Sequence, residues 1–464
     1  METKGIHRGM FKVTSNQNSI TYSPSESLSD RIRSVKKFPT IVEQHLNVDP
    51  LSWVQQQSES TKLVWGDRGS EQLTVGLGSA VHVISDGFEP PSEVIDRCRE
   101  LLRDLPDLRL YGGFAFRPDQ EERESAWNVF GPASFWLPRA TLNNNRLRIV
   151  VRSLNDRTAA IQFADRLKFD VVEPSSKCLT DCVAREDLPG REQWERCIEA
   201  ANTMFRDEVL EKIVLSRRVD LDFVASIDPL QLMRQLRDVT PACYHFCFQT
   251  SRNVAFLGAT PERLFFRRNQ QFVSEVVAGT RPRGTSTAED AKLGEDLLAS
   301  AKDQLEHDIV RKSIRQRLHT CVNRLEVDAH ATLLKLANKQ HLFSRVSGEL
   351  KTHIDDGDLL YRLHPTPAVG GYPKENALDE IQRLEPFDRG WFAAPVGWVS
   401  DDAAEFAVAI RSGLVQNRRL SLYSGAGIVP GSDALAEWDE VEHKISDFLQ
   451  LVRLAKPPVP TLGS

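Results

Sequence analysis

Two patterns of apolar and polar residues alternate along the chain from residue 50 onward. Short segments in which every second residue is apolar predict β-strands, and longer segments with apolar residues three or four positions apart predict helices. The predicted strands are residues 73–85, 146–154, 212–223, 242–250, 254–260, 263–268, 406–415 and 419–429. The predicted helices are residues 91–105, 191–210, 228–239, 288–322 and 433–454. Most consecutive strands are separated by a turn, so we predict an α+β fold of large, mainly antiparallel sheets covered by helices.

Three segments lack this patterning. Residues 1–45 are polar and rich in serine, and we expect them to form a partly ordered N-terminal arm. Residues 174–190 are the best candidate for a linker between the less patterned N-terminal third and the remainder. Residues 456–464 are rich in proline and are predicted to be a disordered tail.

The composition excludes several classes of protein. Lys and Arg number 59 and Asp and Glu number 65, so the net charge is −6 and no basic surface for nucleic acid is indicated. A local basic pocket could still bind an anionic small molecule. No run of 18 apolar residues predicts a membrane span, and no apolar segment near the N-terminus predicts secretion. The seven cysteines are an odd number that suits reduced thiols, and we expect a cytoplasmic protein.

Two cysteine pairs have the spacing C-x₃-C, namely Cys178/Cys182 and Cys243/Cys247, and His245 lies inside the second pair. The second pair falls on a predicted strand, where residues four apart are separated by about 13 Å. That distance is too long for one zinc ion, so we expect buried cysteines that pack as small apolar residues.

Two predicted helices each carry a pair of acidic residues three positions apart. The pairs are Asp303/Glu306 and Glu437/Glu440, and Lys444 follows four residues after Glu440. Residues at this spacing lie on one face of a helix. A solvated charged face explains most such pairs.

Glycine-containing loops precede both acidic helices, at residues 278–284 and 423–432. If the two helices face each other, four carboxylates converge, and such a cluster requires a divalent cation. Hard oxygen ligands with open positions for water and substrate favour Mg²⁺ over Zn²⁺.

Two residues are candidates for acid–base chemistry. Lys212 begins an otherwise apolar strand, where a lysine usually extends its amine to solvent but could act as a general base if burial lowered its pKa. Glu262 lies in a turn between two strands and could act as a general acid. Neither residue identifies a site by itself.

Three further features could bind a ligand. His364 lies in the Pro/Gly-rich loop 363–373, although a single histidine is more often structural. Arg411 ends a predicted strand and suits bidentate binding of a carboxylate. The glycines of residues 424–427 could offer backbone N–H groups to an anion.

Taken in order, these motifs resemble those of the chorismate-utilising enzymes. The resemblance covers residues 190–452 and includes EKIVLSRR, GATPERLF, AGTRPRG, KDQLEHDIV, LHPTPAVGGYP, RGWFAAPVGW, FAVAIRS, YSGAGIVPGS and EWDEVEHK. It implies a single chorismate-binding domain, residues 46–455, with two large, orthogonally packed antiparallel sheets and helices outside.

Within this family, the chain is most similar to the isochorismate synthases. Members that use ammonia have glutamine at the position of Lys212, so the lysine implies that water is the nucleophile. The loop 363–373 is also similar to the version in isochorismate synthases. Four N-terminal segments resemble isochorismate synthases of menaquinone biosynthesis: DPLSWVQQQ, KLVWGDR, YGGFAFRP and FGPASFWLP.

The resemblance also implies roles for individual residues. Lys212 would activate water for attack on C2 of chorismate, and Glu262 would protonate the departing C4 hydroxyl. Mg²⁺ would be bound by Glu306 and Glu440, assisted by Asp303 and Glu437. The implied substrate-binding residues are Thr280, His364, Arg411, Gly425, Gly427 and Lys444.

Two alternatives remain open from the sequence. A salicylate synthase would add pyruvate elimination to the same first step, and a non-catalytic subunit would bind chorismate without converting it. We expect a monomer or weak dimer with chorismate as its small-molecule partner and with no nucleic-acid or membrane partner.

Overall fold

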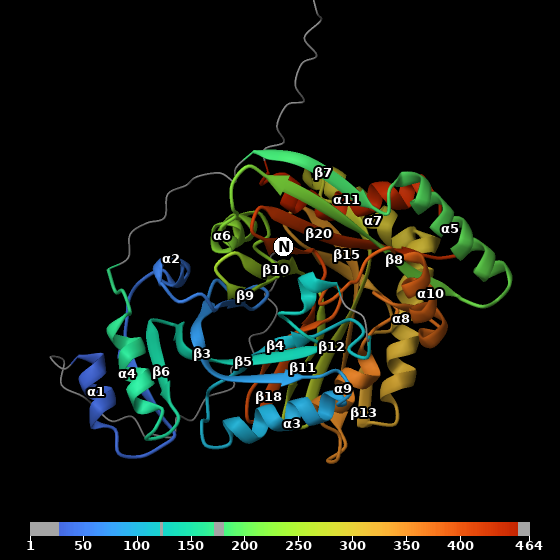
Figure 1. Ribbon diagram of the computed structural model, residues 1–464. Coiled ribbons are helices and arrows are strands. Elements are labelled where there is room, and N and C mark those ends of the chain that lie inside the picture. The colour runs from blue at the N-terminus through green and yellow to red at the C-terminus, as the bar shows by residue number, and fades with distance from the viewer. Residues whose placement is uncertain (1–26, 121–123, 171–180, 453–464) are drawn as a thin grey trace, which may run out of the picture.

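Two rows of antiparallel strands form the centre of the protein in the computed structural model, which describes residues 27–120, 124–170 and 181–452 (Figure 1). Neighbours in the first row are β7 (Cys182–Leu188), β8 (Lys212–Phe223), β20 (Arg419–Ile428), β19 (Ser412–Gln416), β10 (Val254–Thr260), β9 (Tyr244–Ser251), β2 (Lys62–Gly66) and β3 (Leu73–Ser85). Neighbours in the second row are β5 (Ala133–Asn143), β4 (Leu110–Phe114), β17 (Pro395–Val399), β18 (Ala403–Val408), β11 (Arg263–Arg268), β12 (Gln271–Pro282) and β15 (Lys339–Leu350).

The long strands β3 and β5 pair with each other and join the two rows into one hydrogen-bonded network of 20 strands within the described residues. The remaining strands extend this network at its edges: β1 (Thr40–His45) and β6 (Arg146–Val151) beside β5, β13 (Val322–Val327) and β14 (Thr332–Lys335) beside β15, and β16 (Gly371–Tyr372) beside β8. Every described pair is antiparallel, as the short turns between the strands predict.

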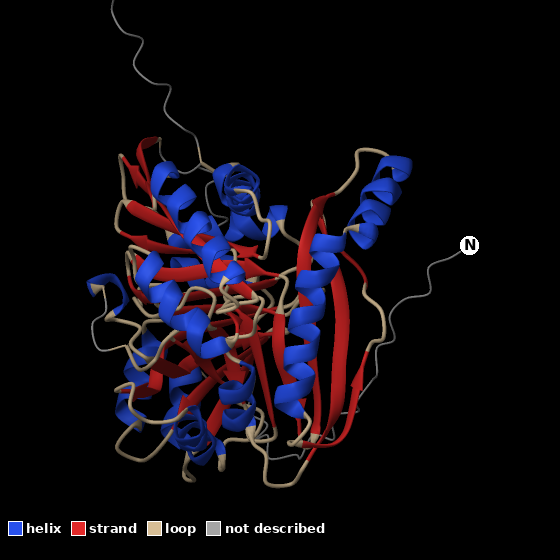
Figure 2. Ribbon diagram, turned by 90° about the vertical axis from the view of Figure 1, so that its right-hand side faces the viewer, coloured by secondary structure: helices blue, strands red, loops and turns tan. Residues whose placement is uncertain are grey.

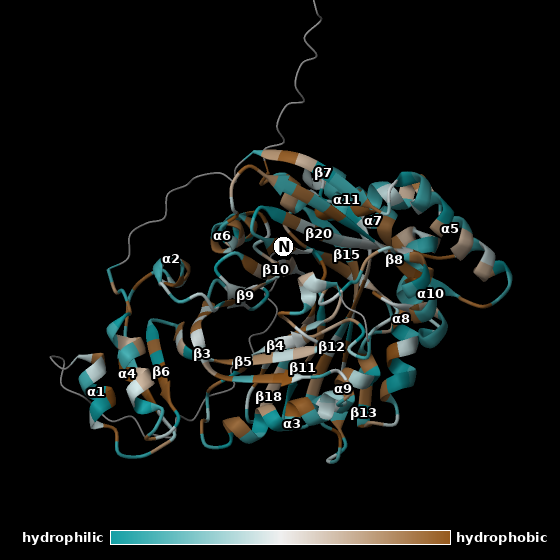
Figure 3. Cartoon of the chain, in the orientation of Figure 1, coloured by the Kyte–Doolittle hydropathy of each residue, from teal (hydrophilic) through white to brown (hydrophobic). Residues whose placement is uncertain are grey.

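Helices cover the outside of the strands. They are α1 (Leu28–Ser34), α2 (Pro50–Gln56), α3 (Pro91–Leu102), α4 (Arg157–Asp165), α5 (Arg191–Arg206), α6 (Pro229–Val239), α7 (Thr287–Ala299), α8 (Ala301–Leu318), α9 (Asp356–Leu363), α10 (Lys374–Leu384) and α11 (Ala434–Leu449), with a short 3₁₀ helix at Ser125–Trp127. The helices on the right of Figure 1, among them α5, α8 and α10, lie in front of the strands in Figure 2. Helix α10 is mainly hydrophilic in Figure 3 and buries only Ala377 and Ile381 against β8. The predicted α+β architecture is therefore confirmed.

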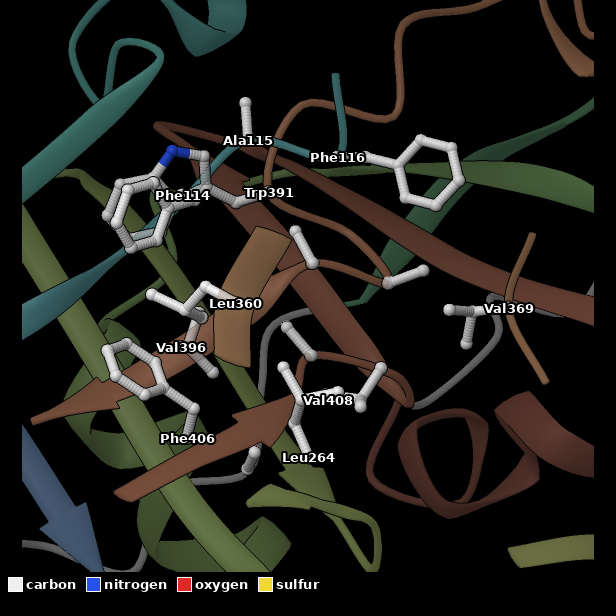
Figure 4. Close-up of a cluster of buried hydrophobic side chains, with 14 of the residues drawn as sticks. Phe114, Ala115, Phe116, Leu264, Leu360, Val369, Trp391, Val396, Phe406 and Val408 are labelled. Carbon is white, nitrogen blue, oxygen red and sulfur yellow. The ribbon is translucent and has the colours of Figure 1, made fainter. Parts of the chain in front are cut away.

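Aromatic and branched side chains fill the space between the strands and the helices. Figure 4 shows part of this core, where Phe114 of β4, Val396 of β17 and Phe406 of β18 gather with Leu360 of α9. The rings of Phe114 and Phe406 are 6.3 Å apart between centroids. Burial of such side chains, at roughly 1.5–3 kcal/mol each, gives the strands a rigid frame for any site built on their ends.

Two predicted elements are divided in the structure. The helix predicted at 288–322 breaks at Ser300, whose backbone is extended and whose hydroxyl accepts the N–H of Asp303 as the N-cap of α8. The strand predicted at 406–415 breaks at Arg411, which has φ +49°. Because β18 lies in the second row and β19 in the first, the chain passes from one row to the other at Arg411.

The N-terminal arm and the linker contain more structure than the pattern predicts. Helix α1 and strand β1 lie within residues 1–45, and β1 pairs with β6 of the sheet. Strand β7 lies within the predicted linker 174–190 and pairs with β8. Residues 1–26, most of the remaining linker and the predicted tail 456–464 lie outside the described residues. None of the helices in the described part of the chain combines the length and apolar character needed to cross a membrane.

Candidate active site

The ends of β8, β12 and β20 and the turn at Arg411 line a partly enclosed cavity with a volume of about 80 Å³. Eight of the predicted site residues line it: Glu262, Thr280, Glu306, Arg411, Gly425, Gly427, Glu440 and Lys444. Residues that are 182 positions apart in the sequence thus meet in one place, as the motif order predicts.

Lys212 lies at the first position of β8. Successive side chains of a strand alternate between its faces, so Lys212, Val214 and Ser216 share a face, and the latter two line the cavity. Lys212 has no exposed surface, and its Nζ donates to Oε1 of Glu306 at 2.9 Å. The amine is therefore directed inward, contrary to the usual solvent-exposed position of a lysine at a strand end.

Glu262 lies in the turn between β10 and β11 and is only 4% exposed. Burial raises the pKa of its carboxyl to about 8. The charge of Glu275 acts in the same direction, whereas the cations Lys212, Lys444 and Arg411 oppose it. A carboxyl with this pKa carries its proton at neutral pH, so Glu262 can donate a proton inside the cavity.

An ion pair between Lys302 of α8 and Glu437 of α11 links the two acidic helices. Burial lowers the pKa of Lys302, but its hydrogen bond to Glu437 and the charges of Glu437, Glu440 and Glu306 outweigh burial and raise it. Three predicted metal-binding carboxylates therefore face one ammonium group.

The fourth predicted carboxylate, Asp303, is oriented differently. Its Oδ2 accepts from Arg281 at 2.8 Å, and its side chain packs beside Gly279, where a Cβ would lie 2.8 Å from Oδ1. Gly279 has φ +66°, so this close approach uses a backbone conformation that glycine adopts most readily.

The donor types of this cluster suit a divalent cation, but the geometry differs from a preformed metal site. Among residues 27–120, 124–170 and 181–452, no group of three or more His, Cys, Asp or Glu side chains is arranged to hold a metal ion. Each predicted ligand is paired with a basic side chain, as in Glu306–Lys212, Glu440–Lys444 and Glu437–Lys302. The carboxylate oxygens match the preference of Mg²⁺, and its positive charge would take over the role of Lys302 among them.

A basic group opposes the acidic helices across the cavity. Arg411 is 7% exposed, and its Nη2 lies 2.8 Å from Nε2 of His341. Nδ1 of His341 lies 3.1 Å from Oγ1 of Thr280, its register partner on the neighbouring strand. Burial lowers the pKa of His341 well below its usual value, and the charge of Arg411 acts in the same direction. His341 is therefore neutral and can accept from Arg411 while Thr280 remains available to a ligand.

The predicted substrate-binding residue His364 does not line this cavity. It caps α9, its Nε2 lies 3.2 Å from the carbonyl oxygen of Phe116, and its ring packs edge-on against the Phe116 ring. The structure thus assigns the cavity histidine to position 341. His341 lies in an ordinary alternating strand, and only its register opposite Thr280 distinguishes it.

Sequence patterns also missed Ser216 and Arg389, which both line the cavity. The hydroxyl of Ser216 is buried without a hydrogen-bond partner, and it lies opposite Gly425 in the β8–β20 register. Arg389 donates to the carbonyl oxygens of Val214 and Val369 at 2.8 Å. Alternation along β8 from Lys212 predicts the orientation of Ser216, whereas no local pattern indicates Arg389.

The glycines of β20 leave room for neighbouring side chains at the cavity. A Cβ on Gly427 would lie 2.2 Å from Oε1 of Glu306 and 3.1 Å from Cε of Lys212. A Cβ on Gly425 would lie 2.8 Å from Oγ of Ser216. The carbonyl oxygen of Gly425 also accepts from Lys444 at 2.9 Å, and this bond directs the lysine toward the cavity.

We expect Gly427→Ala to reduce turnover by about 100-fold, because the added methyl group displaces the carboxylate of Glu306 from Lys212. Steady-state kinetics and thermal unfolding would be measured together. Gly190→Ala is the matched control, because a Cβ there meets only the Asp187 carbonyl oxygen at 3.9 Å. Wild-type turnover in Gly427→Ala would contradict a close-packed arrangement at this point.

Known proteins share both the sequence and the fold. Isochorismate synthase MenF of Bacillus subtilis is 31% identical over 435 residues, which are 87% of this chain and 91% of the relative. Isochorismate synthase 2, chloroplastic, of Arabidopsis thaliana is 36% identical over 393 residues, which are 80% of this chain and 69% of the relative. The solved structure of MenF, the menaquinone-specific isochorismate synthase from Escherichia coli, is similar with a TM-score of 0.81 at 30% identity and covers 92% of this chain and 99% of that chain.

The similarity in sequence and in fold thus extends over most of this chain. A family model described as "Chorismate binding enzyme" matches residues 27–453. This match includes α1 and β1 as well as the residues that line the cavity. The chain belongs to the chorismate-binding enzyme family.

Proposed function

We propose that this protein converts chorismate to isochorismate by adding water at C2 and removing the hydroxyl at C4. The observation that carries this proposal is a fully buried amine, Lys212, whose charge acts on a buried carboxyl, Glu262, with a pKa raised to about 8. The relatives that span most of the chain are isochorismate synthases, which supports the same reaction. Extensive similarity to MenF supports the menaquinone branch as its setting.

In the proposed reaction, Lys212 acts as a neutral amine that takes a proton from water as the oxygen forms a bond to C2. Glu262 gives its proton to the C4 hydroxyl, which leaves as water while the ring double bonds shift. One water enters and one leaves, so the product is an isomer of chorismate. The positive charge of Lys212 opposes the raised pKa of Glu262, but burial of the carboxyl outweighs it.

The substrate carries two carboxylates, and the cavity offers donors for them. We assign carboxylate binding to Arg411 and Lys444, with backbone support from Gly425 and Gly427. Thr280 can donate its hydroxyl proton to the substrate, with neutral His341 holding Arg411 in place. His341 takes the place in the substrate site that sequence patterns assign to His364.

We also propose Mg²⁺ as the cofactor, bound by Glu306 and Glu440 and supported by Asp303 and Glu437. When bound, it would supply the positive charge that offsets the ring carboxylate of the substrate against these acidic side chains.

Incubation of the enzyme with chorismate and Mg²⁺, followed by chromatography of the products, tests the function. We expect isochorismate without stoichiometric release of pyruvate. Salicylate together with pyruvate would establish a salicylate synthase instead. Chorismate binding without any product would support the non-catalytic alternative.

We expect Glu440→Gln to weaken Mg²⁺ binding by roughly 10- to 100-fold, because the site loses a negatively charged oxygen ligand. Isothermal titration with Mg²⁺ alone measures this effect without reference to turnover. Asp439→Asn changes an exposed acid one position away on α11 and serves as the control. Equal affinity in Glu440→Gln and wild type would exclude Glu440 as a ligand.

A further inference from the structure

The turn after β2 contacts the turn that carries Glu262. It begins at Asp67 and Arg68, the last two residues of the N-terminal KLVWGDR motif, and the Asp67 carbonyl oxygen accepts from the Ser70 N–H at 3.1 Å. Trp65, on β2, donates its Nε1–H to Asp67 Oδ1 at 2.8 Å. Arg68 then reaches across to donate to the carbonyl oxygen of Pro261 at 2.6 Å. An arginine from the N-terminal third therefore holds the peptide group immediately before the proposed acid.

Arg68 also makes a bidentate ion pair with Glu275 of β12. Its two terminal nitrogens lie 2.7 and 2.6 Å from the two carboxylate oxygens, and the Glu275 side chain is only 3% exposed. Arg68 is itself 16% exposed and lies over the ring of Tyr244, with Cζ 5.6 Å from the ring centroid. The fork geometry of a guanidinium suits this simultaneous contact with a carboxylate and a carbonyl oxygen.

The residue after Glu262 is fixed by the same carboxylate. Arg263 donates to Glu275 at 3.0 Å and to Glu405 at 3.1 and 3.0 Å. The turn is thus held on both sides of Glu262, before it by Arg68 and after it by Arg263. Glu275 joins the two arginines.

Glu275 also acts on Glu262 through its charge. Burial is the main cause that raises the pKa of Glu262, and Glu275 raises it further. The other charged groups that act on Glu262, Lys212, Lys444 and Arg411, all lower this pKa. Arg68 and Arg263 partly neutralise Glu275, so the arginines limit how strongly Glu262 holds its proton.

We propose that Arg68 is a positioning residue for the reaction, which orients the turn of Glu262 through the Pro261 carbonyl and tempers the charge of Glu275 beside that acid. The inference rests on the proposed function of Glu262 as the proton donor. It gives Arg68, the last residue of the KLVWGDR motif, a positioning role in the reaction, although Arg68 lies about 190 positions from Glu262 in the sequence.

Two substitutions should move the proton-donor pKa in opposite directions. Arg68→Met removes a positive charge from Glu275, so the carboxylate form of Glu262 is disfavoured further and its pKa rises. Glu275→Gln removes the negative charge, so the pKa of Glu262 falls. We expect shifts of about 0.5–1 pH unit in the basic limb of the kcat/KM profile. Arg68→Met should also lower kcat about tenfold, because the turn loses its anchor.

Arg68→Lys separates charge from geometry. A lysine keeps the positive charge but cannot contact both Glu275 oxygens and the Pro261 carbonyl through a planar fork. We expect its basic limb at the wild-type position and its kcat between those of wild type and Arg68→Met. The matched control is Arg139→Met, which removes another bidentate arginine, paired with Asp156 at 2.6 and 2.7 Å outside the cavity. The control should leave the pH profile unchanged.

Infrared titration of the protonated Glu262 carboxyl, with Glu262→Gln as the reference, measures the same pKa without turnover. Opposite shifts for Arg68→Met and Glu275→Gln in folded protein support the inference. The inference would be overturned if the pKa of Glu262 stayed unchanged in both Arg68→Met and Glu275→Gln. It would also be overturned if Arg139→Met shifted this pKa as much as Arg68→Met does. If Glu262→Gln keeps wild-type turnover, the proposed function of Glu262 fails instead, so the two failures are distinguishable.

Discussion

Lys212→Met is expected to reduce kcat by about 10²- to 10⁴-fold, because the variant retains the volume of the side chain but has no base to activate water. The amine is fully buried and contacts Glu306 of α8, so no bulk water can replace it. Binding of chorismate and of Mg²⁺ should persist, because the residues proposed to bind them do not include Lys212. Product formation is measured by chromatography, and binding is measured by calorimetry.

A second buried lysine provides the control for this experiment. Lys62 is 8% exposed, and its Nζ donates to the Gln55 carbonyl oxygen at 2.9 Å outside the cavity. Lys62→Met should lower stability without changing kcat. If Lys212→Met turns over at the wild-type rate, Lys212 is not the base.

Glu262→Gln is expected to lower kcat by a similar factor, because an amide cannot protonate the departing hydroxyl. In the wild type, the carboxyl with a pKa of about 8 is protonated below that pH and loses its proton above it. Activity should therefore fall on the basic side of pH 8, by tenfold per pH unit once the carboxylate dominates. This basic limb should be absent from the residual activity of Glu262→Gln.

Stability gives an independent check on the same carboxyl. Its folded pKa of about 8 lies above the ordinary value of 4.5, so the stability of the wild type falls as the pH rises from about 4.5 through about 8. The glutamine variant does not titrate. Its thermal stability relative to wild type should increase between pH 5 and pH 9, and a constant difference would contradict the raised pKa.

The structure also suggests why the reactive groups tolerate burial. Lys212 is paired with Glu306, Glu440 with Lys444, and Glu437 with Lys302, so isolated charges are avoided. Glu262 avoids the cost by holding its proton. The cavity therefore combines one acid kept neutral with several ion pairs that a ligand can rearrange.

Local patterns supplied candidates for the site. The acidic pairs on two helices were found from their spacing, whereas Lys212 at the start of a strand and Glu262 in a turn were not distinctive alone, and the resemblance to the family motifs connected them. The structure brings Lys212 within hydrogen-bond distance of Glu306 and joins the helices through Lys302 and Glu437. Local patterns succeed here because each residue is positioned by the element that contains it.

The cavity histidine could not be found in this way. His364 lies in the loop 363–373, and His341 lies on β15, a strand that the apolar pattern did not predict. Only the pairing of β12 with β15 sets His341 opposite Thr280. Likewise, the helix is interrupted at Ser300 because this residue caps α8. The left-handed backbone at Arg411 accompanies the passage of the chain from one row of strands to the other. A pattern of apolar residues contains no information about such long-range pairings.

The amino-acid sequence by itself determined part of the strands and helices, among them β8, β10, β20 and α11, together with the antiparallel character of the sheet and the chemical types of the candidate site residues, because periodicity and turn chemistry act over a few neighbouring positions. The pattern did not indicate β12 or β15. Only the tertiary structure decided which histidine faces the cavity, which basic side chain pairs with each carboxylate and which N-terminal arginine contacts the turn of Glu262. These contacts form only when strands distant in the sequence pair in register and bury their charged side chains together. A buried charge is costly unless an opposite charge lies beside it, so buried groups such as Lys212 and Glu437 are found with a partner from another element.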